Sequence, residues 1–98
     1  MYNESSRIIA LAVQNHPGVM SHITGLFSRR AFNLDGILCG ELNNGSSSKI
    51  YLLVKNDDGL AQIIKQLEKL HDVIEVSLHD NYDCSLFSRI HDLIKAKV

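Results

Sequence analysis

"RIIALAVQNHPGVMSHITGLFSRRA", residues 7–31, changes its hydrophobic period once, at a proline followed by a glycine. Before that junction, residues 7–14 are a short apolar run, which predicts a β-strand. One strand face would carry Ile9, Leu11 and Val13, and the other Ile8, Ala10 and Ala12. Because both faces are apolar, we expect a strand that is covered on both sides, or nearly so.

After Pro17 the apolar residues recur at spacings of three and four, which predicts an amphipathic helix of about four turns. Its apolar stripe comprises Val19, Met20, Ile23, Leu26, Phe27 and Ala31. Proline is tolerated in a first helical turn because no intrahelical hydrogen bond needs its N–H there. We therefore expect Pro17 to lie in the first turn of this helix.

The rest of the chain predicts two further strands, a second helix and a fourth strand. Residues 33–42 and 49–55 read as strands of a hairpin, joined by the turn-forming stretch "NNGSSS". Asp57 or Asp58 can cap the next helix. The apolar stripe of this helix is Leu60, Ile63, Ile64, Leu67 and Leu70. Apolar and polar residues alternate over residues 72–79, which predicts a strand with Ile74, Val76 and Leu78 facing inward. Glu68 and Asp72 are expected on a solvated helix face.

The predicted order, β-α-β-β-α-β, is that of the split βαβ, or ferredoxin-like, fold of the α+β class. It combines a four-stranded antiparallel sheet with two helices on one face and right-handed crossovers. We expect this domain to span residues 1–80. Residues 81–98 are expected to form a tail with an amphipathic helix over 84–96.

Composition argues against several classes of function. Ten basic and eleven acidic residues leave a net charge of −1, so long-range attraction to nucleic acid is weak. Cys39 and Cys84 lack the second pair that a metal cage needs, and we expect buried or idle thiols in a reducing cytosol. The chain shows neither a signal peptide nor an apolar run that could cross a bilayer. A cytoplasmic protein without a metal, nucleic acid or membrane partner is expected.

The sequence lacks the residues that RNA binding or catalysis on this fold would require. An RNA-binding version needs aromatic side chains on the central strands, where only Tyr51 occurs. The five histidines, His16, His22, His71, His79 and His91, show no metal-type or acid–base spacing and are expected to be solvated or capping. An acyl-phosphate hydrolase would need an arginine in the first loop, whereas Arg29 and Arg30 lie far along the helix. We expect no catalytic residue in this chain.

The junction itself predicts a site for a small anion. The N–H groups of Gly18, Val19, Met20 and Ser21 would point outward at the positive end of the helix dipole. Gly18 has no side chain, so a ligand can approach the backbone there. An ordinary helix start without a ligand explains the same two residues, and this alternative stays open at this point.

Two asparagines extend this prediction toward an amino acid. Asn15 ends the first strand and Asn33 begins the second, and they meet only if those strands are neighbours or face each other across a dimer. Amide side chains offer donors and acceptors, which suits a ligand that carries both carboxylate and ammonium. An apolar wall would come from Val19, Met20, Leu34 and Ile37.

The segment "NHPGVMSHITGLFSRRAFNLDGILC", together with "LEKLHDVIEVS", resembles the ACT domain of the regulatory small subunits of acetohydroxyacid (acetolactate) synthase, in the short, single-domain, valine-responsive type. The resemblance covers roughly residues 8–78. It implies a non-catalytic subunit of branched-chain amino-acid biosynthesis, which stimulates a catalytic large subunit and confers feedback inhibition by valine. That partner is expected to use thiamine diphosphate, Mg²⁺ and FAD.

The resemblance also implies an effector site at the interface of an ACT homodimer, with Asn33 contributed by the partner copy. The effector-binding residues that we expect are Asn15, His16, Pro17, Gly18, Val19, Met20, Asn33, Leu34 and Ile37. His16 departs from the acidic residue that relatives often have there. The alternative is a free-standing ACT amino-acid sensor that controls another enzyme or a transcription factor.

Overall fold

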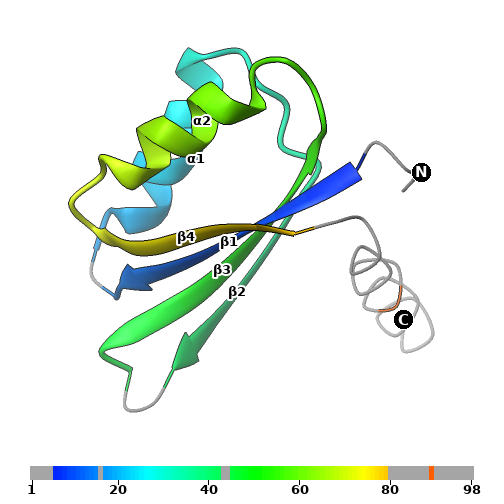
Figure 1. Cartoon of the computed structure of the whole chain (residues 1–98). Helices are drawn as coiled ribbons and strands as arrows, with labels where there is room; N and C mark the ends of the chain where they lie inside the picture. The colour runs from blue at the N-terminus through cyan, green and yellow to red at the C-terminus, as the bar shows by residue number, and fades with distance from the viewer. Residues whose placement is uncertain (1–5, 16, 43–44, 80–88, 90–98) are drawn as a thin grey trace.

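The computed structural model describes residues 6–15, 17–42, 45–79 and 89, and its elements follow the predicted order (Figure 1). The strands are β1 (Ser6–Gln14), β2 (Gly36–Leu42), β3 (Ser47–Lys55) and β4 (Val73–His79), and the helices are α1 (Val19–Arg29) and α2 (Leu60–Glu68). No helix in these ranges is long and apolar enough to span a membrane. The predicted C-terminal helix lies outside the described residues, apart from Arg89.

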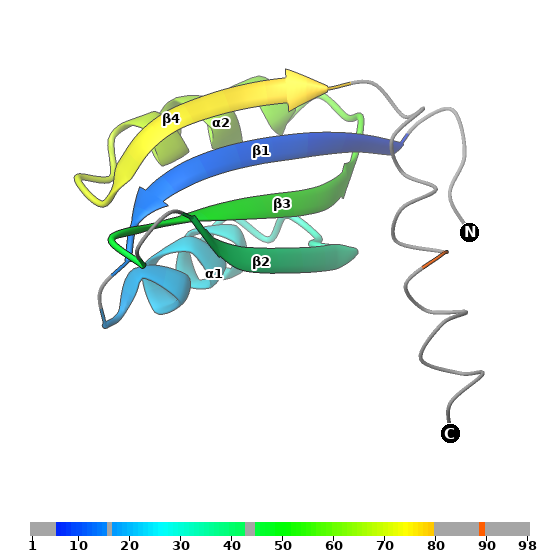
Figure 2. The ribbon, with the colours of Figure 1, turned by 90° about the horizontal axis from the view of Figure 1, so that it is seen from below.

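The four strands form one antiparallel sheet in the order β2-β3-β1-β4, which confirms the ferredoxin-like fold (Figure 2). Both helices cover the same face of the sheet. Helix α1 lies on the side of β2 and β3, and α2 lies on the side of β1 and β4. The edges of the sheet are therefore β2 and β4, and the two strands next to α1 in the chain, β1 and β2, are separated by β3.

The main core lies between the helices and the inward face of the sheet. Ile9, Leu11 and Val13 of β1 are fully buried, and Ile23 of α1 and Ile63 of α2 pack onto the same cluster. Burial of such side chains stabilises a domain by about 1.5–3 kcal/mol each. The amphipathic stripes that the sequence predicts are thus the surfaces that hold the helices on the sheet.

The outward face of the sheet carries a second, smaller cluster. Ile8 of β1 and Leu53 of β3 are buried there, with Leu38 and Tyr51 packed against them. Ala10, on the same face of β1, is also buried. The prediction that β1 is covered on both sides is therefore confirmed for these positions.

The ends of α1 differ from the prediction. The helix begins at Val19, because Gly18 is its N-cap with a non-helical φ of +90°, so the placement of Pro17 in the first turn is wrong. It ends at Arg29, about three turns later. Ala31 follows with a φ of +52° and is exposed, so it does not belong to the apolar stripe.

The hairpin of β2 and β3 is confirmed, with shifted limits. β2 begins at Gly36 rather than at residue 33, and Ser47 and Ser48 of the predicted turn belong to β3. Ser48 is 4% exposed and pairs with Val13. A serine can occupy a strand where its backbone completes the ladder, which the composition of "NNGSSS" does not reveal.

The start of α2 also departs from a simple cap. Gly59 is the N-cap, so neither Asp57 nor Asp58 occupies that position. The carboxylate of Asp57 instead accepts a hydrogen bond from the Gly59 N–H at 2.7 Å, which orders the turn before the helix. Leu60, Ile63 and Leu67 are buried as predicted.

Strand β4 shows the clearest departure from simple alternation. Its pairing with β1 shifts between Ala12 and Val13, so that Val73, not Ile74, lies opposite Val13. The irregularity turns Ile74 outward, and its exposed fraction is 60%, so the prediction that it faces inward is wrong.

Two polar residues also lie where the sequence does not predict them. Asp72 is 1% exposed rather than solvated, and its carboxylate lies beside α1, between His22 and His71. Cys39 is a free cysteine exposed on β2, so of the two alternatives expected for it, buried or idle, the first does not hold. Cys84 lies outside the described residues.

Candidate functional site

The start of α1 gathers most of the expected effector residues. We call Asn15, Pro17, Gly18, Val19 and Met20 the helix-start group; His16 lies outside the described residues. Asn15, Pro17 and Gly18 are exposed, Met20 is half-buried and Val19 is 7% exposed. The group therefore presents backbone and amide to solvent while Val19 anchors the turn in the core.

Gly18 has the conformation and the surroundings that close approach of a ligand requires. Its φ is +90°, which L side chains rarely adopt, and a Cβ built there would meet no atom within 4 Å. The space in front of this backbone is open. Glycine at position 18 is thus explained by its φ, while the open space remains available to a ligand.

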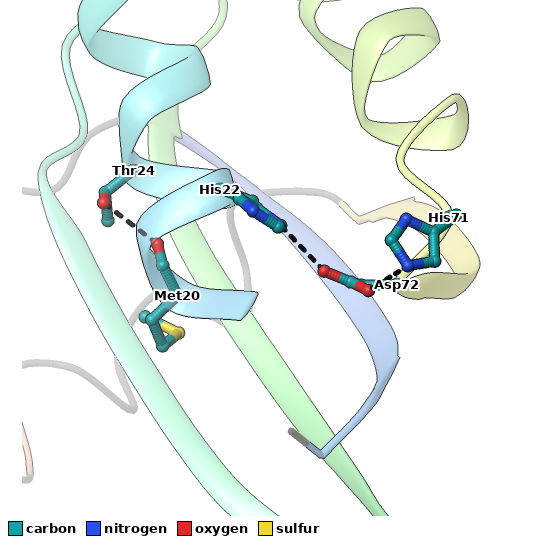
Figure 3. A network of polar contacts seen from close by, with 5 residues as sticks. All are labelled: Met20, His22, Thr24, His71 and Asp72. Carbon is teal, nitrogen blue, oxygen red and sulfur yellow. Dashed lines mark hydrogen bonds and ion pairs between the residues drawn. The ribbon is translucent and has the colours of Figure 1, made fainter. Parts of the chain in front are cut away.

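The electrostatics of the helix start favour an anion. His22 N–H donates to Gly18 O at 3.0 Å, the first bond of the helical pattern. The amides of Val19 and Met20 precede it, at positions that generally lack an intrahelical acceptor. The first turn of α1 carries no acidic residue, so no carboxylate on that turn offsets the positive end of the helix dipole. Thr24 Oγ1 donates to the carbonyl of Met20 at 2.9 Å (Figure 3).

Asn15 is held beside this turn by two contacts with the β2–β3 hairpin. Its backbone N–H donates to Ser46 O at 3.2 Å, and its Nδ2 donates to Gly45 O at 2.8 Å. With its nitrogen oriented toward the hairpin, the side chain keeps Oδ1 as an acceptor. Asn15 can therefore accept a hydrogen bond from a cationic group.

The remaining expected residues form the β2-start group, Asn33, Leu34 and Ile37. Asn33 is exposed and its Nδ2 donates to Asp35 Oδ1 at 2.5 Å, so that it too retains Oδ1 as an acceptor. Asp35 also pairs with Lys55 at 3.5 Å. Leu34 packs partly against the core, and Ile37 is 38% exposed on the edge strand.

Within one chain these two groups do not meet. Ile37 pairs with Leu52, which pairs with Ile9, whereas the helix-start group follows Gln14, five residues further along β1. Five residues of strand correspond to about 17 Å. Since β3 separates β1 from β2, the idea that these strands are neighbours is wrong. Asn15 and Asn33 therefore lie at opposite ends of the sheet.

One polar cluster beside the helix start was missed by sequence reasoning. Asp72 Oδ2 lies 2.8 Å from His22 Nδ1, and Asp72 Oδ1 lies 3.0 Å from His71 Nε2 (Figure 3). The histidine side chains are 53% and 84% exposed, whereas Asp72 is buried. Fifty residues separate His22 from Asp72, so no local pattern could have revealed this pair. Among the described residues, no group of three or more His, Cys, Asp or Glu is arranged to hold a metal ion.

Comparison with known proteins shows which family the sequence of this chain matches. Residues 9–75 match the family described as the AHAS small subunit-like ACT domain. The small subunit of acetolactate synthase isozyme 1 from Escherichia coli K12 is 48% identical over 83 residues, which are 85% of this chain and 85% of that protein. The acetolactate synthase small subunit of Bacillus subtilis is 37% identical over 91 residues, which are 91% of this chain but 52% of that protein.

A solved structure shows the same fold. The crystal structure of the acetolactate synthase small subunit from Thermotoga maritima superimposes with a TM-score of 0.67 at 38% identity. The match covers 74% of this chain and 46% of that one. The similarity to E. coli thus extends over most of both proteins, whereas the other two relatives are about twice as long as the part that matches.

Proposed function

This chain belongs to the family of ACT-domain small subunits of acetolactate synthase, and from that membership we propose that it binds valine between two copies of itself and so regulates a catalytic large subunit. It is a regulatory rather than a catalytic subunit. The observation that carries the proposed site is the start of α1, where Gly18, at φ +90°, opens the backbone to a ligand.

The ligand carboxylate would lie on the amides that follow Gly18. This position combines backbone N–H donors with the positive end of the helix dipole, and the first turn has no acidic side chain to oppose an anion. Hydrogen bonds to a charged group contribute about 1.5–3 kcal/mol each. A carboxylate is therefore the group that this turn suits best.

A second copy supplies what one chain lacks. β2 is an edge strand whose end, Leu42, pairs with Ser47, which in turn pairs with Gln14 beside the helix-start group. Antiparallel pairing of β2 with β2 of a second copy would place the start of one β2 beside the end of the other. The β2-start group of each copy would then approach the helix-start group of the other. Pairing through β4, at the opposite edge, would not bring these groups together.

The two groups together suit a branched amino acid. The ammonium group would donate hydrogen bonds to Oδ1 of Asn15 and to Oδ1 of Asn33 from the second copy. Both amides have their oxygen available as an acceptor because their Nδ2 atoms donate to Gly45 and to Asp35. The side chain of the ligand would contact Met20, Leu34 and Ile37, which are partly exposed apolar residues. Loss of one methylene in such a contact costs roughly 1–3 kcal/mol, which separates valine from alanine.

The regulated enzyme would be a thiamine diphosphate-dependent acetolactate synthase, with Mg²⁺ and FAD held by the large subunit rather than by this chain. Because valine would lie between two copies, its binding would change how the two copies pack against each other and, through that, how they bind the large subunit. Coupling between such sites is typically about 1–3 kcal/mol. Feedback inhibition by valine would follow from that bias.

Two measurements test this proposal. The tagged chain is co-expressed with candidate large subunits and purified, and valine binding to the chain is measured by isothermal titration calorimetry. We expect a large thiamine-dependent subunit to co-purify and valine to bind with one site per chain. Valine binding without any such partner would instead support a free-standing sensor, and absence of valine binding would overturn the assigned effector.

A further inference from the structure

A single residue, Asp72, holds the chain on both sides of the loop that carries the helix-start group. On the near side, Gln14 N–H donates to the backbone carbonyl of Asp72 at 2.8 Å. On the far side, His22 Nδ1 lies 2.8 Å from Asp72 Oδ2 (Figure 3). The segment between Gln14 and His22, which we call the effector loop, is therefore bounded at both ends by hydrogen bonds to the same residue.

The side-chain bond has the chemistry of a strong anchor. A carboxylate oxygen accepts, so Nδ1 of His22 carries the proton in this contact. The carboxyl group is 1% exposed, and the loss of a partner from a buried charged group is costlier than the same loss at the surface. Asp72 itself is fixed to the sheet, because the next residue, Val73, begins β4 opposite Val13. The contact of His22 with Asp72 thus fixes the position of α1 relative to the end of the sheet.

We propose that Asp72 and His22 are positioning residues for the effector loop: they fix the distance between the end of β1 and the start of α1, and so preset the backbone amides that receive the ligand carboxylate. This inference deepens the proposed function and rests on it. A loop whose ends are already held loses less conformational freedom when a ligand binds, and it binds more tightly for that reason.

His71 provides a matched control. It contacts the same carboxyl group, with Nε2 at 3.0 Å from Oδ1, but it belongs to the connection between α2 and β4 rather than to the effector loop. A variant of His71 disturbs the surroundings of Asp72 without releasing α1. An effect of His22 that His71 does not share would therefore report on the loop.

The experiment compares His22→Ala, His22→Asn and His71→Ala. Asparagine keeps a nitrogen donor at the δ position and has a helix propensity close to that of histidine, so His22→Asn tests rescue of the bond. Valine affinity is measured by calorimetry at a temperature where circular dichroism shows each variant fully folded. Amide hydrogen exchange is measured without valine at position 15, the first residue of the effector loop, at position 22, which follows the loop, and at Ile9 in the core.

We expect His22→Ala to weaken valine binding about three- to tenfold, which corresponds to loss of part of one charge-assisted hydrogen bond. Exchange at positions 15 and 22 should accelerate more than exchange at Ile9. His22→Asn should recover most of the affinity, and His71→Ala should stay within about twofold of the unmodified chain.

The outcomes separate this inference from the proposed function. Valine affinity unchanged in folded His22→Ala, or exchange accelerated equally at all three positions, would overturn the positioning role and leave a purely structural contact. Failure of the unmodified chain to bind valine would overturn the proposed effector. Even then, the exchange comparison would decide whether the bond to Asp72 holds the loop.

Discussion

The backbone N–H of Phe32 donates to the carbonyl oxygen of Phe27 at 3.0 Å, and the two rings meet edge to face with centroids 5.9 Å apart. A second bond runs from Ala31 N–H to Ser28 O at 3.1 Å. Together they form a Schellman motif, in which the chain leaves a helix through one residue with positive φ. Here that residue is Ala31, at +52°, where glycine is the usual choice.

Ala31→Gly should stabilise the protein by roughly 0.5–1 kcal/mol. The left-handed conformation costs an L residue about 1–2 kcal/mol, and the greater flexibility of glycine in the unfolded chain cancels part of the gain. Ala31 is exposed, so no packing is lost. Urea denaturation followed by circular dichroism gives the difference, and a variant less stable than the unmodified chain would contradict this account of the helix end.

The irregular pairing of β4 predicts an unequal response at two neighbouring positions. Val73 lies opposite Val13 and packs against the core, whereas Ile74 is 60% exposed. Val73→Ala should therefore cost about 1 kcal/mol, since it removes two partly buried carbons. Ile74→Ala removes more carbon but should change stability by less than about 0.5 kcal/mol. A loss at Ile74 as large as the loss at Val73 in denaturation experiments would contradict this assignment of the two faces of β4.

The fold could be predicted because each helix and strand is specified by a pattern of residues close together in the sequence. The period of residues 7–31 and the stripe of α2 each specify an element, and the order of elements leaves one common topology. The bulge at Ile74, the αL residue Ala31 and the burial of Asp72 could not be predicted. The bulge and the buried aspartate depend on which strand lies opposite and which helix lies nearby, and neither relation is encoded in the spacing of neighbouring residues. Ala31 is a local feature, but it was missed because glycine, not alanine, is the usual residue at a helix end with positive φ.

The candidate site divides in the same way. Pro17 and Gly18 indicate a helix start from sequence alone, and the structure moves that start by only two residues. The sequence also names Asn33, but the sheet order is needed to learn that it lies at the far end of the same chain from Asn15. The bond between His22 and Asp72 connects residues fifty positions apart and is visible only in the folded protein.

A charge placed at the start of α1 should abolish valine binding. Gly18→Asp would set a carboxylate in the position proposed for the ligand carboxylate, with open space to receive it. Both Asp and Asn tolerate positive φ better than other L residues, and each should cost at most about 1–2 kcal/mol of stability. Calorimetry should show no valine binding to Gly18→Asp.

Gly18→Asn is the control for that experiment. It has the same shape as Gly18→Asp and meets the same backbone strain, but it carries no charge. We expect weakened yet measurable binding. If both variants bind valine as the unmodified chain does, the carboxylate does not lie at this turn.

The apolar side of the site predicts a change in ligand preference. Ile37 is partly exposed on the edge strand, at the position proposed to contact the valine side chain. Ile37→Ala should weaken valine binding by about 1–2 kcal/mol but alter the weaker binding of alanine much less, since alanine has no branch to lose contact. Competition calorimetry with both amino acids measures this. A uniform loss for the two ligands would instead indicate damage to the pairing of β2.

The central claim is that each site takes its helix-start group from one chain and its β2-start group from another. Two defective variants should then repair each other. Gly18→Asp damages only the first group, and Asn33→Ala damages only the second, by about 1.5–3 kcal/mol if Asn33 binds the ammonium. A mixed dimer of the two would contain one site with both changes and one site with neither.

The decisive measurement is calorimetric titration of valine into an equal mixture of Gly18→Asp and Asn33→Ala chains, unfolded together and refolded so that the dimers exchange. With random pairing, about one quarter of all sites should bind valine with the affinity of the unmodified protein, although neither variant alone does so. Absence of any such sites in a mixture shown to contain mixed dimers would mean that the site does not join two chains in this way.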